Sequence, residues 1–158
     1  MSALPPIAGD LQGSGRKFAL VASRYNESTV ELLIAGANET LLKHSVDAAD
    51  IQLFRVPGTW EIAQAAEEVA AIGEVDAVIA LGVVVRGETP HFDHLCAECA
   101  AALGRVSSKY RLPISFGVLT CDTYNQARDR AGGKVGNKGS EAAQAALEMA
   151  NLFESLRS

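Results

Sequence analysis

Four short apolar runs, separated by segments with helical spacing, dominate the hydrophobic pattern of this 158-residue chain. Continuous apolar runs of this length are typical of strands that are buried on both faces of a sheet. We therefore predict strands at residues 17–23, 51–56, 76–85 and 113–120. The run at 76–85, DAVIALGVVV, is the most apolar of the four and should be the central strand.

The segments between these runs have the periodicity of amphipathic helices. In the first of them, one helical face would carry Val30, Leu33, Ile34, Ala37 and Leu41. A capping box at 28–31 should start this helix, which ends near residue 44, and Thr59 should be the N-cap of the next. The further predicted helices are 60–72, 91–111, 124–131 and 140–156. Because strands and helices alternate, the chain should fold as a three-layer α/β/α sandwich around a four-stranded parallel sheet.

Composition and charge narrow the class of protein. Hydrophobic residues make up 48% of the chain, enough for a core, and the net charge of −5 with no basic block argues against nucleic acid as a partner. No apolar run approaches the roughly 18 residues that span a bilayer, so we expect no membrane partner. Three cysteines and an N-terminus without an apolar signal core indicate a cytoplasmic protein. Residues 1–16 should form an irregular arm and residues 17–158 a single domain.

The candidate catalytic and binding residues lie where the predicted strands end, which is where open α/β sheets bind their ligands. The most informative segment is 82–94, a strand that breaks at Gly87 and continues as a helix opening on His91. The free N–H groups of a helix start attract anions, and histidine moves protons near neutral pH. For this segment alone, an ordinary strand–helix connection with a solvent-facing histidine is the alternative.

Aromatic residues occupy similar positions. Tyr25 and Trp60, the only tryptophan, follow the first and second strands and could stack on a planar ligand, although Trp60 could equally pack in the core. Phe116 lies inside the fourth strand, where alternation could direct it toward a ligand or a neighbouring subunit. Together the strand ends predict a site for a planar polar ligand and an anion, with general acid–base catalysis and no metal.

Two other patterns are weaker. His91, His94, Cys96 and Cys99 spread over more than half of a helix circumference, so they do not converge on a tetrahedral ion, and we expect the cysteines to be packing residues. The glycine-rich segment 132–140 lacks the spacing of a phosphate-binding loop and should be a flexible connection between helices. Its Lys138, with nearby Arg130, could still supply positive charge to a phosphate.

Five motifs, in this order, resemble the lumazine synthase family, which catalyses the penultimate step of riboflavin biosynthesis. They are Ser23-Arg24-Tyr25-Asn26, the segment VPGTWEI at 56–62, the segment 81–94, FGVLT at 116–120, and RAG at 130–132 with NKG at 137–139. The resemblance covers residues 17–157 and implies a flavodoxin-like fold. It also implies condensation of 5-amino-6-(D-ribitylamino)uracil with 3,4-dihydroxy-2-butanone 4-phosphate to 6,7-dimethyl-8-ribityllumazine, phosphate and water, without organic cofactor or metal.

The resemblance also assigns roles to residues. His91 corresponds to the family's proton-transfer histidine, and Tyr25 to an aromatic, commonly Phe or Trp, that stacks on the pyrimidine. The family's residues that bind the ribityl chain correspond to Thr59, Trp60 and Glu61. Those that contact the pyrimidine edge correspond to Val83, Val84 and Val85. Those that bind the phosphate correspond to Glu88, Thr89 and Arg130, with Lys138 nearby. Phe116 corresponds to an aromatic donated by the neighbouring subunit.

The family's sites lie between subunits of a pentamer, so the resemblance implies a homo-oligomer. The short connection at 132–139 resembles members that assemble twelve pentamers into a 60-subunit icosahedral capsid, with riboflavin synthase as a partner that such a capsid could enclose. By analogy, the arm before residue 17 could add a strand to a neighbour's sheet. Two alternatives stay open: a non-catalytic protein that binds flavin or lumazine on the same scaffold, and a purely structural shell protein.

Overall fold

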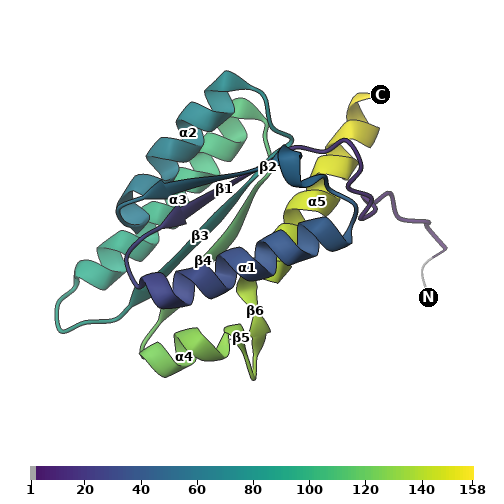
Figure 1. Cartoon of the computed structure of the whole chain (residues 1–158). Helices are drawn as coiled ribbons and strands as arrows, with labels where there is room; N and C mark the ends of the chain where they lie inside the picture. Colours follow the sequence, from purple (N-terminus) through teal and green to yellow (C-terminus); the bar gives the residue numbers. More distant parts are fainter. Residues whose placement is uncertain (1–2) are drawn as a thin grey trace.

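A parallel sheet of four strands forms the centre of the computed structural model, which describes residues 3–158 (Figure 1). The strands are β1 (Phe18–Ser23), β2 (Ile51–Val56), β3 (Ala77–Val85) and β4 (Ile114–Cys121). Their order is β2-β1-β3-β4, with every neighbouring pair parallel. β1 is buried along its whole length and β3 along all but its last residue, whereas β2, at the edge of the sheet, has only its last residue buried. The apolar run at 76–85 is therefore an interior strand, as predicted.

Long helices cover both faces of the sheet (Figure 1). α1 (Glu27–Lys43) and α5 (Lys138–Arg157) pack on one face, and α2 (Ile62–Ile72) and α3 (His91–Tyr110) on the other. Successive strand residues alternate between the two cores, so that Leu20 faces α1 and α5 while Val21 faces α2 and α3. The three-layer α/β/α sandwich is confirmed. No helix of residues 3–158 is long and apolar enough to cross a membrane.

Short elements lie at the ends of the long ones. Two 3-10 turns, η1 (Ala48–Asp50) and η2 (Thr59–Glu61), flank β2, and α4 (Tyr124–Asp129) follows β4. The connection at 132–140, expected to be a flexible link, is instead an antiparallel hairpin of β5 (Ala131–Gly133) and β6 (Gly136–Asn137) that leads into α5. Asn137 then caps α5, because its side chain accepts a hydrogen bond from the Ser140 N–H at 3.1 Å.

The expected starts of two helices were wrong. α1 begins at Glu27 rather than after a capping box at 28–31, because Asn26, three residues after the end of β1, is its N-cap residue and adopts a left-handed conformation (φ 61°). Thr59 is not an N-cap but lies buried inside η2, after the extended Gly58. The capping box that does form belongs to α4, where Thr123 and Gln126 bond each other's backbone N–H groups.

The N-terminal arm packs on the last helix of its own chain. Asn151 of α5 is buried and donates to the carbonyl oxygens of Asp10 (2.9 Å) and Gln12 (3.0 Å), while its own oxygen accepts from Arg16 Nε at 2.7 Å. At Gly9 a Cβ would lie 1.9 Å from a carbonyl oxygen of α5, so only glycine permits this approach. The arm is irregular, as expected, and its first two residues lie outside the described part.

Candidate active site

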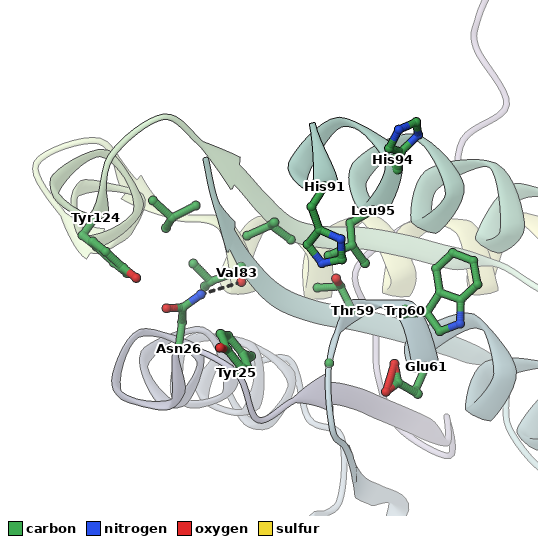
Figure 2. A pocket seen from close by; sticks show the side chains of 13 residues that line it. Tyr25, Asn26, Thr59, Trp60, Glu61, Val83, His91, His94, Leu95 and Tyr124 are labelled. Atoms are coloured by element: carbon green, nitrogen blue, oxygen red, sulfur yellow. Dashed lines mark hydrogen bonds between the residues drawn. The ribbon is translucent and has the colours of Figure 1, made fainter. Parts of the chain in front are cut away.

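A cavity of about 490 Å³ opens at the carboxyl ends of β1, β2 and β3 (Figure 2). It is lined by Tyr25, Asn26, Gly58, Thr59, Trp60, Glu61, Val83, Val84, Val85, His91, His94, Leu95 and Tyr124. These residues come from five separate segments of the chain, 25–26, 58–61, 83–85, 91–95 and residue 124. They meet because the parallel strands all point the same way, so their carboxyl ends share one edge of the sheet.

The turn after β1 supplies Tyr25 and Asn26. Asn26 adopts a left-handed backbone conformation, which asparagine tolerates better than most residues, and its Nδ2 donates to the Val83 carbonyl at 2.9 Å. This turn leaves Tyr25 75% exposed at the cavity (Figure 2). Sequence reasoning included Asn26 in a motif but gave it no role, because its partner lies 57 residues away.

The end of β3 presents backbone to the cavity. β1 pairs with β3 only as far as Leu81, whereas β4 pairs with it up to Val85. The edge of residues 83–85 that faces β1 therefore has no strand beside it, and Asn26 bonds one of its carbonyls. A planar polar ligand could hydrogen-bond along this edge as a further strand would.

The turn after β2 brings Thr59, Trp60 and Glu61 to the opposite part of the lining. Thr59 is buried, but Trp60 is 56% exposed, so the core-packing alternative for this tryptophan is wrong. Gly82 of β3 lies beneath the turn, and a Cβ there would be 3.0 Å from Thr59 Cγ2. Glycine at this position thus lets the turn approach the sheet closely.

His91 is the first residue of α3 and points into the cavity (Figure 2). Its backbone N–H lies 3.4 Å from Thr89 Oγ1, at the turn that precedes the helix. His94 lies one turn further along α3 and also borders the cavity, farther out in Figure 2. Glu88 and Thr89 are exposed in the turn and are not part of the cavity lining.

Arg86 ties together the elements around His91. Its Nε donates to Asp122 at 2.9 Å, its Nη1 to Asp93 at 3.2 Å, and its guanidinium carbon lies 4.4 Å from the centre of the Phe92 ring. The hydrogen bond to Asp122, with a further contribution from Asp93, raises the pKa of Arg86. Sequence reasoning missed this role, although Arg86 lies in the segment 82–94 that it singled out.

The remaining predicted site residues lie elsewhere. Phe116, Arg130 and Lys138 line a second cavity of about 490 Å³ beside β4, with Thr120 and Glu141 on its wall. None of the three lines the first cavity. One chain therefore places the histidine in one cavity and the predicted phosphate-binding cations in another.

The cysteines are not grouped for metal binding. Cys99 is buried between α2 and α3, and Cys96 packs at the edge of the same core, as expected for packing residues. Within residues 3–158, no three His, Cys, Asp or Glu side chains are placed to hold a metal ion. Cys96, Cys99 and Cys121 are all free thiols.

Comparison with known proteins gives a consistent result. A family model described as 6,7-dimethyl-8-ribityllumazine synthase matches residues 15–154. The chain is 52% identical over 149 residues to a 6,7-dimethyl-8-ribityllumazine synthase of Aquifex aeolicus, covering 94% of this chain and 97% of the relative. It is 49% identical over 150 residues to the enzyme of that name from Salinibacter ruber (95% and 96% covered), and 43% identical over 156 residues to that from Desulfovibrio desulfuricans (99% and 100% covered).

Proposed function

The chain belongs to the 6,7-dimethyl-8-ribityllumazine synthase family, and we propose that the cavity holding His91 is where it performs this family's reaction. It is a transferase of riboflavin biosynthesis that condenses 5-amino-6-(D-ribitylamino)uracil with 3,4-dihydroxy-2-butanone 4-phosphate. The products are 6,7-dimethyl-8-ribityllumazine, phosphate and water. The observation that carries the site assignment is the position of His91, inside a cavity built from strand ends.

The reaction requires repeated proton transfer. The 5-amino group attacks the ketone, and water leaves as the imine forms. Phosphate is then eliminated, and the resulting enol tautomerises to a ketone. The ribitylamino nitrogen attacks this carbonyl, and a second water leaves as the ring closes. His91 projects into the cavity from the start of α3 and could accept or donate a proton at each step. The alternative of a non-catalytic flavin- or lumazine-binding protein gains no support from the relatives, which are named as synthases.

The cavity suits the pyrimidine substrate. Tyr25 offers an exposed ring for stacking, and the free backbone edge at residues 83–85 offers hydrogen-bond donors and acceptors to the pyrimidine. The polar groups of Thr59, Trp60 and Glu61 would bind the ribityl hydroxyls. Glu88 and Thr89 lie in the turn at the start of α3, where we expect the phosphorylated ketone to bind.

A complete site would need two copies of the chain. Arg130 and Lys138 carry the positive charge that a phosphate requires, yet they line the second cavity with Phe116. We propose that a neighbouring copy presents this second cavity to His91 of the first, which makes the active form a homo-oligomer, with a pentamer as its unit.

The exposed edge strand β2, with Leu53 and Phe54 exposed, is where the arm of a neighbour could add a strand. The short hairpin at 131–137 carries no insertion and fits assembly of twelve pentamers into a 60-subunit capsid, with riboflavin synthase as a candidate enclosed partner. The three free cysteines fit a reducing compartment, and we place the enzyme in the cytoplasm.

The function is tested by mixing purified protein with both substrates and following lumazine formation by absorbance and fluorescence. The wild type should exceed the spontaneous background, and His91→Ala should reduce the rate. His44→Ala is the matched control, because His44 lies at the end of α1 and bonds Thr40 there, away from the cavity. Tight flavin binding by an assembled protein without turnover would instead favour the binding-protein alternative.

The shared site is tested by complementation. His91→Ala and Arg130→Ala each remove one half of the proposed site, so each homo-oligomer should be impaired. In oligomers assembled from equal amounts of the two variants, about a quarter of all sites should be intact. Half of the chains carry wild-type His91 and the other half carry wild-type Arg130, so random pairing brings the two together at that frequency. If the mixture is no more active than the average of the two variants, His91 and Arg130 do not act across an interface.

A further inference from the structure

Tyr124 lines the same cavity as Tyr25 and His91, although it comes from a different element. It is the first residue of α4, and its side chain is 61% exposed. Figure 2 shows the ring reaching into the cavity, with its hydroxyl directed toward Asn26. Within residues 3–158 this hydroxyl has no hydrogen-bond partner. An aromatic ring and a free hydroxyl are thus both available to a ligand.

The backbone that carries Tyr124 is held firmly. Gln126 Oε1 accepts from the N–H groups of Asp122 (2.8 Å) and Thr123 (3.2 Å), and the Gln126 N–H donates to Thr123 Oγ1 at 3.1 Å. Asp122 also bonds Arg86, which in turn bonds Asp93 of the helix that begins with His91. A continuous set of hydrogen bonds therefore links the backbone of α4, which begins with Tyr124, to α3, which begins with His91. Such a network fixes the positions of residues that contact a ligand.

The charges around the cavity indicate which substrate Tyr124 would contact. None of the described residues that line this cavity is a lysine or an arginine, and the one carboxylate in its lining belongs to Glu61. The cations Arg130 and Lys138 line the other cavity. An uncharged planar heterocycle suits the first cavity better than a phosphate does.

We propose that Tyr124 is a substrate-binding residue that forms a second aromatic wall, beside Tyr25, for the pyrimidine and for the lumazine made from it. The inference rests on the proposed function and adds a residue that selects the planar substrate over the phosphorylated one. The ring supplies most of the contact through its face, and the hydroxyl adds a polar contact at the edge of the ligand.

The test compares Tyr124→Leu and Tyr124→Phe with Tyr110→Leu, all in the assembled protein. Tyr110 ends α3, where its ring lies 5.1 Å from Lys109 Nζ, and it does not line the cavity. Tyr124→Leu should raise KM for the pyrimidine amine about five- to tenfold and leave KM for the phosphorylated ketone within about twofold. Tyr124→Phe should keep the pyrimidine KM within about threefold, and Tyr110→Leu should change neither constant.

Two results would overturn the inference. One is a pyrimidine KM that is the same in Tyr124→Leu as in the wild type. The other is a change in oligomeric state, measured by light scattering after gel filtration, with KM unaltered, which would make Tyr124 an interface residue. If the wild type shows no turnover, the proposed function fails instead. Fluorescence titration with 6,7-dimethyl-8-ribityllumazine then decides the inference independently, since an equal Kd for wild type and Tyr124→Leu would refute it.

Discussion

The side-chain amide of Asn26 donates a 2.9 Å hydrogen bond to the backbone carbonyl of Val83 and so joins the turn after β1 to the end of β3. The contact fills part of the backbone edge that β1 leaves unpaired beyond Leu81. It also holds the left-handed turn that directs Tyr25 to the cavity. Asn26 thus meets a conformational and a hydrogen-bonding demand at one position.

Replacing Asn26 separates these two demands. Asn26→Ala should destabilise the protein by about 2 kcal/mol. It removes the hydrogen bond to Val83, and alanine adopts a positive φ less readily than asparagine does. Asn26→Gly should cost only about 1 kcal/mol, since glycine adopts the left-handed conformation freely. Apparent melting temperatures, measured at one fixed protein concentration, should decrease from the wild type to Asn26→Gly and then to Asn26→Ala. Equal melting temperatures for the two variants would show that the left-handed turn carries no cost.

His91 and His94 should differ in their contribution to turnover. His91→Gln should lower kcat by about 100-fold or more, because a glutamine side chain cannot carry the proton. His94→Gln should lower it by about threefold at most, since His94 lies farther out on α3. Both residues are exposed, so melting temperatures should stay near wild type. Equal losses of kcat would show that the two histidines share the proton-transfer role.

Arg86 is expected to act by positioning α3. Arg86→Met removes the bonds to Asp93 and Asp122 and should lower kcat by about tenfold, because His91 is then less well oriented. Arg86→Lys should recover only part of this loss, since an ammonium cannot reproduce the forked contacts of a guanidinium. Steady-state kinetics with both substrates test this, with the effect expected on kcat more than on KM. A wild-type kcat in Arg86→Lys would show that only the positive charge of Arg86 matters, and not its forked hydrogen bonds.

Cys99 should make stability depend on alkaline pH. Burial raises the pKa of its thiol from 9.0 to about 11, with a smaller contribution from Cys96. The folded state therefore keeps the thiol proton at pH values where the unfolded chain has lost it. The contribution to stability is complete below pH 9 and decreases as pH rises to about 11, by at most about 3 kcal/mol.

Denaturant unfolding of wild type and Cys99→Ala across this range isolates the effect. Other groups also titrate there, so the informative quantity is the difference between the two pH profiles. Cys99→Ala should lose less stability between pH 9 and 11 than the wild type does. Parallel profiles would show that the thiol is not protected by the fold.

The strands were the most predictable part of the fold. The strand predicted at 51–56 has the bounds of β2, and the other three agree to within a residue at each end. A strand buried on both faces appears in the sequence as a local apolar run, so it can be predicted without knowledge of distant contacts. The start of α1 was misplaced because a left-handed Asn26 replaced the usual cap, and the hairpin at 131–137 was missed because glycine-rich segments carry no hydrophobic pattern.

The sequence alone determined the layered architecture, the family, and the gathering of Tyr25, Thr59 and His91 at the strand ends, because apolar periodicity and strand direction are local properties. Only the tertiary structure decided which side chains meet. It placed Arg130 in a separate cavity from His91, brought Tyr124 into the first one, and joined Arg86 to Asp122 across 36 residues. Such contacts depend on the strand order β2-β1-β3-β4 and on turn geometry, which set the distances between residues far apart in the chain.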